Sequence, residues 1–386
     1  RAAGLPDARV IVPAGVQGGK RAGEKEVQPF AFARGAFTQP LIDVSLPARY
    51  RRGNLELLLA QQRLNVAVLE QLHTARLAFY SAAYHDALRS FGEDQRQRLE
   101  ANARAQSDRF EAGQADRQAV TLSRVLEQEL TPRIEESRRS ARAALLTLAL
   151  AMGEQPGRAE LTKPDGELQF EPIEFDVDAE TEAALARRSD LKLARLLVRA
   201  AREDERVAQA DYFPEINATI SGDYIPVSEI RRGSEGSARR SDDIVSSEVR
   251  AGVAYSWRVI DNGRVGGAVA RQRAVREINQ AILARLEADV PRELMRIQNQ
   301  LRALQAKHDA LTKAAGVAEQ TVKDVQNNLA QGLSTQLEYR TAESSYLETK
   351  AGIVSVAYQQ NIALAERDRI TGRYFQFSDD TTGKLH

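Results

Sequence analysis

The sequence predicts a mainly α-helical fold with a small β part, in which long antiparallel helical hairpins are joined to two pairs of strands. Three observations predict this fold class. Landmark residues recur at a nearly constant offset, long stretches show the three-and-four-residue period of packed helices, and one stretch alternates apolar and polar residues as strands do. Together they indicate one structural unit that the chain uses twice.

A tandem repeat organises the chain. Three pairs of landmark residues recur at offsets of 218 or 219 residues: Asp43 with Asp261, Gly113 with Gly332, and Gly153 with Gly372. A repeat of this length must be recognised first, because it determines how every element is assigned. We divide the chain into a first repeat at residues 1–153, a linking segment at 154–180, a second repeat at 181–372 and a C-terminal tail at 373–386.

The composition excludes several classes of function. Lys plus Arg and Asp plus Glu both number 54, so the net charge is zero and lacks the basic excess of a nucleic-acid-binding protein. The absence of cysteine excludes disulfides, thiolate metal sites and a cysteine nucleophile. No histidine lies in a metal-binding spacing, and His308 is expected to pack in a helical seam. The glycines of 263–267 lack the GxGxxG spacing and a Walker lysine. We expect no enzymatic activity, cofactor, metal or nucleic-acid partner.

The first repeat begins with the weaker strand candidates, within about 8–38. Apolar runs at 10–12 and 30–32 predict two strands, although Pro13 and Pro29 disfavour a central position in a sheet. The first residues of the chain resemble those that end a helix in the second repeat. We therefore expect a first helix and any targeting segment to precede residue 1.

A helical hairpin follows at about 50–152. Its first helix is predicted at about 54–110, with an apolar seam over 77–91 that steps by three and four residues, the period of a coiled-coil contact. Gly113 supplies the positive φ of the turn, and Pro132 is expected to kink the returning helix.

The second repeat has the same plan with clearer signals. A helix from about Glu180 to Ala210, with residues 188–191 inside it or at a short break, leads into a strand pair within about 215–258. Apolar and polar residues alternate completely over 216–224, and the same alternation runs through most of 245–257. A second helical hairpin at about 264–371 is expected to bend at Pro291 and to turn at Gly332.

The alternating strands have two interpretations. A soluble, half-buried hairpin also alternates, but strands that span a bilayer need about 9–11 residues each, as these have. From the strands alone both interpretations remain open. Aromatic residues at the strand ends fit the rims of a membrane strand: Tyr212, Phe213, Tyr255 and Trp257.

The phase of the alternation decides which residues would face water. Arg250 facing lipid at mid-depth would cost about 2–4 kcal/mol, so the polar set must face a lumen if the strands span a bilayer. The lumen-facing set is Asn217, Thr219, Ser221, Asp223, Glu248 and Arg250. Two strand pairs are too few to enclose a channel, which predicts a homo-oligomer with cyclic symmetry.

Periodicity alone would also suit a soluble coiled-coil spacer. The direct connection of each hairpin to strands favours a helical tube joined to a barrel. Glu338 follows the second turn and by base rate would be a solvated helix residue. In a symmetric oligomer, however, it would form a carboxylate ring that favours cations and gates a pore.

Four segments carry a family resemblance, and they are Arg188-Ser189-Asp190-Leu191, Ala210-Asp211-Tyr212-Phe213-Pro214-Glu215, the junction from Trp257 to Arg264, and the turn from Asn328 to Ser334. In their order, spacing and duplication the chain resembles the TolC-like outer membrane efflux protein family over essentially its whole length. Ser189 stands where the Arg-Pro-Asp-Leu signature of that family has proline.

The resemblance implies a homotrimer in a Gram-negative outer membrane, in which each subunit gives four strands to a shared transmembrane β-barrel of twelve, continued by a helical tunnel through the periplasm. It implies a porin-like exit duct of a tripartite efflux pump or type I secretion system. The partners would be a periplasmic adaptor, or membrane fusion protein, and an inner-membrane transporter of the RND, ABC or MFS type.

The same resemblance assigns site residues. The adaptor-docking tips would be Ala112, Gly113, Gln114, Gln331, Gly332 and Leu333. Glu338 falls where family members carry an entrance aspartate, and Thr341 stands where a second acidic residue is common. This departure argues against a strongly cation-selective double ring.

We therefore expect a passive duct that performs no chemistry, driven by the inner-membrane partner. The alternative is a periplasmic adaptor or coiled-coil scaffold without a pore. Adaptors usually carry one hairpin, whereas here the hairpin is duplicated beside a strand pair in each copy. A wide, water-filled tunnel makes few specific contacts, so drugs, metals, small metabolites and secreted proteins are all compatible substrates.

Overall fold

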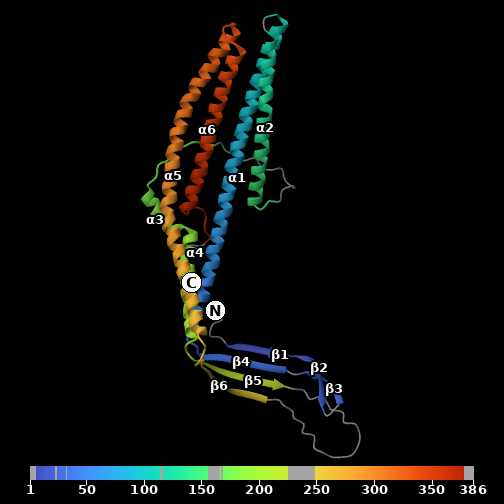
Figure 1. Cartoon of the computed structure of the whole chain (residues 1–386), viewed down its shortest axis with the longest axis vertical. Coiled ribbons are helices and arrows are strands. Elements are labelled where there is room, and N and C mark those ends of the chain that lie inside the picture. Colours follow the sequence, from blue (N-terminus) through green and yellow to red (C-terminus); the bar gives the residue numbers. More distant parts are fainter. Residues whose placement is uncertain are drawn as a thin grey trace, which may run out of the picture. The chain divides into compact units, whose positions relative to one another are not determined.

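A computed structural model describes residues 6–21, 24–31, 33–113, 116–154, 166, 168–224 and 248–377 (Figure 1). The chain forms two compact units. The first unit comprises Arg1–Ala60, Ala194–Ile282 and Asp380–His386, and the second comprises Gln61–Leu193 and Leu283–Asp379. Three helices contribute a part to each unit.

An antiparallel sheet of four strands forms one end of the first unit (Figure 1). Its strands, in spatial order, are β1 (Asp7–Ile11), β4 (Ala33–Ile42), β5 (Glu215–Tyr224) and β6 (Glu248–Ser256). The strands of both repeats therefore join in one sheet, since β4 of the first repeat pairs directly with β5 of the second.

The prediction of only two strands within 8–38 was wrong. The segment between β1 and β4 forms a second antiparallel pair, β2 (Ala14–Arg21) and β3 (Glu24–Ala31). Its glycine- and charge-rich composition hides the pattern of a strand, because apolar alternation is the main sequence signal. The apolar run at 30–32 was expected to form the strand that pairs with β1. Its first two residues instead end β3, and Phe32 lies outside the described residues.

The strands of the second repeat agree with the sequence prediction. β5 begins one residue before the predicted alternation, and β6 covers most of its partner. The predicted start of that partner, at 245–247, lies outside the described residues.

The two helical hairpins match almost residue for residue in length. In the first repeat α1 (Leu46–Glu111) has 66 residues and α2 (Arg117–Ala151) has 35. In the second, α5 (Arg264–Ala330) has 67 and α6 (Gln336–Ile370) has 35. These lengths confirm the tandem repeat.

α1 starts earlier than the sequence suggested. The helix was expected from about residue 54, whereas α1 begins at Leu46 and has Pro47 in its first turn. Proline is tolerated there because the amide it lacks would be unpaired. Asp43 prepares this start, since its Oδ1 accepts a hydrogen bond from Ser45 N at 2.7 Å. Pro132 and Pro291 both lie inside continuous helices, and the bends expected there stay predictions.

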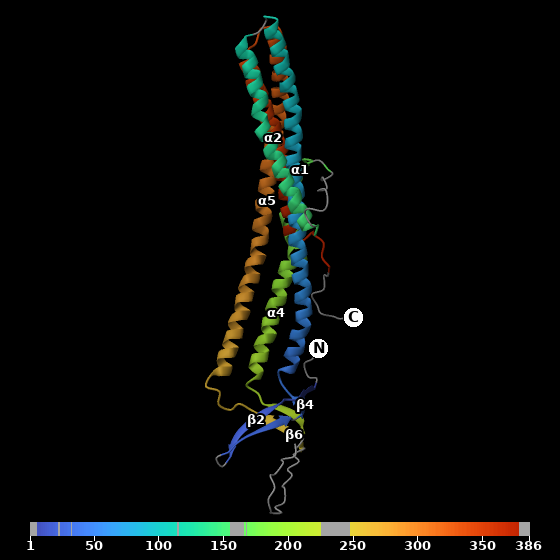
Figure 2. The ribbon, with the colours of Figure 1, turned by 90° about the vertical axis from the view of Figure 1, so that its right-hand side faces the viewer.

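Two shorter helices lead from the linking segment to β5. They are α3 (Val177–Arg187) and α4 (Ser189–Ala210). Of the two alternatives left open by the sequence, a short break in the helix is the one observed, at Arg188. In the first unit α4 is attached to both neighbours. Figure 2 shows α4 between α1 and α5. Arg51 and Arg52 of α1 contact Glu203 and Asp204 at 2.9 and 3.0 Å, and Arg276 of α5 contacts Glu205 at 2.7 Å.

The core of the second unit follows the predicted seam of α5. Leu294, Ile297 and Leu301 are at most 4% exposed and pack with Leu191 of α4 and Ile370 of α6. The next seam residue, His308, is half-buried, and its ring stacks on Phe170 of the linking segment with 3.9 Å between the ring centroids.

Residues 168–176 of the linking segment are irregular and lie against α5 and α6, and its last residues, 177–180, begin α3. The side-chain amide of Gln360 on α6 makes two hydrogen bonds with the backbone of Glu171: it accepts from Glu171 N at 3.0 Å and donates to Glu171 O at 2.6 Å. Gln298 of α5 donates to Phe175 O at 2.9 Å. No helix of the described residues is both long and apolar enough to cross a membrane.

Candidate functional site

The polar residues predicted to line a lumen share one face of the sheet. The register pairs Asn217 with Ala254, Thr219 with Gly252, Ser221 with Arg250, and Asp223 with Glu248. Directly opposite residues of an antiparallel pair point to the same face. The backbone register therefore brings the six predicted residues together, although the side chain of Glu248 is outside the described set.

β4 extends this polar face with a residue that the sequence did not single out. Arg34 lies opposite Asp223, and its Nε donates to the Asp223 carboxylate at 2.7 Å. The pair lies between a strand of the first repeat and one of the second. Only the pairing of β4 with β5 brings the two residues together, so no local sequence signal could have found it.

The other face of the same sheet is apolar and exposed. Along the register, Phe37, Ile220 and Ala251 are neighbours on β4, β5 and β6. The large side chains of this apolar face are between 40% and 77% exposed, and they are Val10, Phe37, Ile42, Ile220, Val249, Val253 and Tyr255. A contiguous exposed apolar face of this kind marks a surface that meets an apolar phase or a partner.

The strand-to-helix junctions carry exposed aromatic residues. Tyr212 and Trp257 are each 51% exposed, and the indole N–H of Trp257 donates to Tyr212 O at 3.2 Å. Asp261 then starts α5, accepting from Gly263 N at 3.1 Å and Val265 N at 2.7 Å. These two amide donors hold the pKa of the Asp261 carboxyl below its ordinary value.

The predicted tips are the turns of the two hairpins, at the same end of the second unit in Figure 1. Gly113 has φ of 71° and Gly332 has φ of 75°, as the turn prediction requires. Ala112 and Gln331 are exposed beside them, and Leu333 is 73% exposed. Gln114 lies outside the described residues.

The second tip is built from two standard helix-end motifs. Gly332 N bonds Leu329 O at 3.2 Å and Leu333 N bonds Asn328 O at 2.8 Å, the bonding pattern of a Schellman motif at the end of α5. Thr335 and Glu338 form a capping box at the start of α6, in which Thr335 N donates to the Glu338 carboxylate at 2.9 Å.

Glu338 and Thr341 are both exposed on the first turns of α6. The hydroxyl of Thr341 donates to Leu337 O at 3.0 Å within the helix. In a single chain the side chain of Glu338 therefore caps the start of α6 through one carboxylate oxygen. The residue is exposed, so its other carboxylate oxygen can face water.

Two contacts tie the hairpins together near the tips. The guanidinium of Arg109 on α1 donates to Leu329 O and Ala330 O, each at 3.4 Å, at the negative end of the α5 dipole. Arg340 of α6 contacts Glu129 of α2 at 2.8 Å. Sequence reasoning missed both, because they depend on how two separate hairpins pack.

A buried carboxyl lies behind the second tip. Glu343 of α6 is 3% exposed, and burial raises the pKa of its carboxyl. The neighbouring Tyr339 is 4% exposed, and burial together with the Glu343 charge raises the pKa of its hydroxyl to about 12. Both residues line a cavity of about 470 Å³ between α1, α5 and α6.

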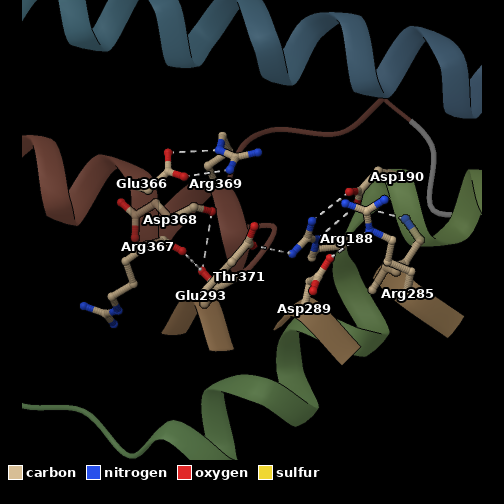
Figure 3. Close-up of polar contacts among 11 residues, drawn as sticks. Arg188, Asp190, Arg285, Asp289, Glu293, Glu366, Arg367, Asp368, Arg369 and Thr371 are labelled. Atoms are coloured by element: carbon tan, nitrogen blue, oxygen red, sulfur yellow. Dashed lines mark hydrogen bonds and ion pairs between the residues drawn. The ribbon is translucent and has the colours of Figure 1, made fainter. Parts of the chain in front are cut away.

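The segment Arg188-Ser189-Asp190-Leu191 forms a buried joint between helices (Figure 3). Arg188 donates twice to Asp190, at 3.0 and 2.8 Å, and once to Glu293 of α5 at 3.3 Å. The pKa of Asp190 is lowered by these contacts, against the opposing effect of burial. Ser189 is the first residue of α4, and its buried hydroxyl has no partner within the described structure.

The end of α6 closes on the same joint. Gly372 has φ of 68°, and a Cβ there would lie 3.0 Å from Arg188 N and 3.1 Å from the carbonyl carbon of Arg187. Gln376 donates to Arg187 O at 2.9 Å. This segment is therefore a structural connection, and no group of metal-ligating side chains occurs among the described residues.

Comparison with known proteins agrees with this arrangement. The family described as outer membrane efflux protein matches residues 181–373, which is half of the chain. No curated protein sequence matches.

Several solved structures share the fold. The outer membrane protein VceC of Vibrio cholerae has a TM-score of 0.75 and 17% identity, covering 96% of this chain and 88% of its own. The CmeC outer membrane channel of Campylobacter jejuni has a TM-score of 0.76 and 12% identity, covering 99% and 80%. The MtrE outer membrane channel of Neisseria gonorrhoeae has a TM-score of 0.72 and 17% identity, covering 96% and 81%.

These matches support the resemblance first recognised in the motifs. The family is one of channel proteins, and its members point to the outer membrane as the location. The chain belongs to the outer membrane efflux protein family and is an outer-membrane exit duct for efflux.

Proposed function

We propose that three copies of this chain form one channel, in which β1, β4, β5 and β6 of each copy build a shared transmembrane barrel and the helices continue as a tunnel into the periplasm. The two-faced sheet carries this proposal. One face holds the polar set that includes Thr219 and Asp223, and the other exposes large apolar side chains such as Val249. A barrel wall between lipid and water needs both faces.

The sheet edges support oligomerisation. β1 and β6 are the outer strands of the four-stranded sheet, and among the described residues each pairs on one side only. Unpaired strand edges inside a bilayer would leave backbone amides and carbonyls without partners at a cost of several kcal/mol each. Pairing β6 of one copy with β1 of the next removes both edges and closes a ring.

The hairpin tips form the periplasmic entrance in this proposal. The exposed residues Ala112, Gly113, Gln331, Gly332 and Leu333, together with Gln114, dock to a periplasmic adaptor. Glu338 of each copy contributes to a carboxylate ring at the entrance, with Thr341 one helical turn further on. The duct performs no chemistry, and an inner-membrane transporter of the RND, ABC or MFS type supplies the energy.

The cysteine-free chain offers a direct test of the two faces. Thr219→Cys and Ile220→Cys place single thiols on adjacent residues of opposite faces. In the full-length protein reconstituted in liposomes, a water-soluble maleimide should label Thr219→Cys at least about tenfold faster, because a thiol facing hydrocarbon stays protonated and unreachable.

The reverse order would contradict the assigned faces. Equal, fast labelling of both positions in a protein that stays monomeric and water-soluble would instead favour the scaffold without a pore.

A further inference from the structure

A cavity of about 570 Å³ lies between α1, α2 and α6 within the second unit. Protein interiors contain few voids larger than a water molecule, so a space of this size between packed helices needs an explanation. Its walls are mainly apolar. The large apolar side chains that line it are Tyr84, Leu88 and Phe91 of α1, Leu130 and Ile134 of α2, and Leu347 of α6.

Small residues create the space. Leu130 and Ile134 of α2 are at most 8% exposed and belong to a core cluster that also includes residues of α1 and α6. Further along α2 the cavity is lined by Ser137 and Ser140, and Ala351 lines it from α6. Serine and alanine therefore occupy positions at which a packed helical seam would carry large apolar side chains.

The helices are in close contact at the cavity. A Cβ added at Gly92 of α1 would lie 2.9 Å from Cγ1 of Ile134 on α2, so these two helices approach closely there. The ring of Tyr84 stacks on Tyr358 of α6, with 4.5 Å between the ring centroids. The cavity is therefore a preformed space whose walls are held in place.

Three uncharged polar groups of the cavity have no hydrogen-bond partner among the described residues. They are the imidazole of His85 and the hydroxyls of Ser137 and Ser140. Burial lowers the pKa of His85 against the opposing effect of the Glu136 charge, so the ring is neutral near pH 7. A helical hydroxyl often bonds its own backbone, as Thr147 does to Ala143 O at 3.1 Å. The two serine hydroxyls can bond a ligand instead.

The charged groups that line the cavity balance one another. Arg133, Glu136 and Glu348 are all exposed, so they lie at its mouth. Glu136 accepts from Arg139 at 2.7 Å, which leaves Arg133 and Glu348 with opposite charges. The cavity therefore has no net charge for a ligand to compensate, and this favours an uncharged ligand.

We propose that this cavity binds an uncharged aromatic molecule of about two rings that carries one hydrogen-bonding group. Cavities lined by Leu, Ile and Phe take up apolar molecules, and pockets of about 300–1,000 Å³ bind molecules of drug size. Tyr84 and Phe91 offer ring contacts, and His85 with the two serines bonds the polar group. The site lies within the helices of one chain, so the inference does not depend on the proposed pore.

Photo-crosslinking with benzophenone tests the proposal. Benzophenone is an uncharged two-ring ketone whose carbonyl accepts a hydrogen bond, and on illumination it attaches to neighbouring C–H groups. The full-length protein is illuminated in detergent at increasing benzophenone concentrations, and the labelled peptides are identified by mass spectrometry. The expected result is saturable labelling within 84–92, 130–140 or 347–351. A folded sample with no label there would show that a neighbouring copy or a detergent chain fills the cavity, and would overturn the proposal.

Two variants fill the cavity from different helices. Ser137→Leu and Ala351→Leu each add an apolar side chain to the space, and each should reduce the labelling of these peptides at least about tenfold. Ser345→Leu is the matched control, because Ser345 is exposed on α6 and lies outside the cavity. It should be labelled as wild type is. Circular dichroism confirms that each variant is folded. Labelling that both filling variants leave unchanged would overturn the proposal.

A third variant tests the hydrogen-bonding group without filling the space. Ser137→Ala combined with Ser140→Ala removes both hydroxyls and keeps the cavity open. The benzophenone concentration at half-saturation should rise about fivefold, the change expected for the loss of one neutral hydrogen bond. An unchanged half-saturating concentration would overturn the assigned class of ligand.

Discussion

Glu338 closes the capping box of α6 and, in the proposed trimer, also contributes to the entrance ring. Two substitutions separate these roles. Glu338→Gln keeps a side chain that can accept from Thr335 N but removes the charge, so it should lower cation selectivity with little loss of stability. Glu338→Ala should lower selectivity equally and also cost about 0.5–2 kcal/mol.

Ion selectivity is measured as a reversal potential in a salt gradient, and stability as a denaturant midpoint. A reversal potential that neither substitution changes would remove Glu338 from the entrance and leave it a helix cap.

Glu343 predicts a dependence of stability on pH. Burial raises the pKa of this carboxyl above its ordinary value of 4.5, so the folded protein holds the proton more tightly than the unfolded chain. Stability from this group is therefore greatest below pH 4.5 and is lost as the pH rises through the raised value. Glu343→Gln should stabilise the protein at pH 7.5 by about 1 kcal/mol or more, and by less at pH 5.

Melting curves of the two proteins at both pH values test this. Glu348→Gln, an exposed position on the same helix, is the control and should change neither curve. A loss of stability in Glu343→Gln at pH 7.5 would show that the carboxylate is held favourably by the charge of Arg98, which lowers its pKa against the effect of burial.

Individual site residues could be predicted only where their role is local. Gly113 and Gly332 predict turns because they follow long helical patterns, and Thr219 belongs to the alternation of apolar and polar residues over 216–224. Arg34 and Arg109 were missed because each acts on a partner about 190 to 220 residues away. Such contacts depend on which strands and hairpins become neighbours, and a single sequence does not encode that in any nearby pattern.

At the scale of elements, Gly372 tests the joint between α6 and the Arg188 segment. Alanine at a positive φ costs about 1–2 kcal/mol, and at Gly372 the new Cβ would also meet the backbone of Arg187 and Arg188. Gly153 is its repeat equivalent, with φ of 80° and no described atom within 4 Å of a Cβ. Gly372→Ala should therefore lose clearly more stability than Gly153→Ala, measured as denaturant midpoints.

Equal losses from the two substitutions would show that the backbone at the joint moves freely enough to accept a methyl group. The comparison is well matched because both glycines end a 35-residue helix.

The helices and strands that carry a regular pattern of apolar residues were predicted best. α5 and β5 carry regular apolar patterns and were located to within one residue at their starts. β2 and β3 were not found, because glycines and charges replace the alternation that identifies a strand. The start of α1 was expected near residue 54 but lies at Leu46, with Pro47 in the first turn, a position that tolerates proline.

At the scale of the whole molecule, the repeat explains why one chain carries two helical hairpins and a four-stranded sheet to which both repeats contribute. Joining β4 to β5 makes one sheet from two copies of the unit, and three chains would complete a barrel. The number of subunits cannot be predicted from the periodicity of a single chain. The proposed trimer is therefore based on the family resemblance and on the outer strands β1 and β6, which can pair between copies.

Single-channel conductance of the full-length protein in a planar bilayer tests the central claim most directly. The account predicts long-lived conductance steps from a sample that runs as a trimer in detergent, reduced in cation selectivity by Glu338→Gln. A correctly folded sample that stays monomeric and water-soluble and produces no conductance would contradict the channel.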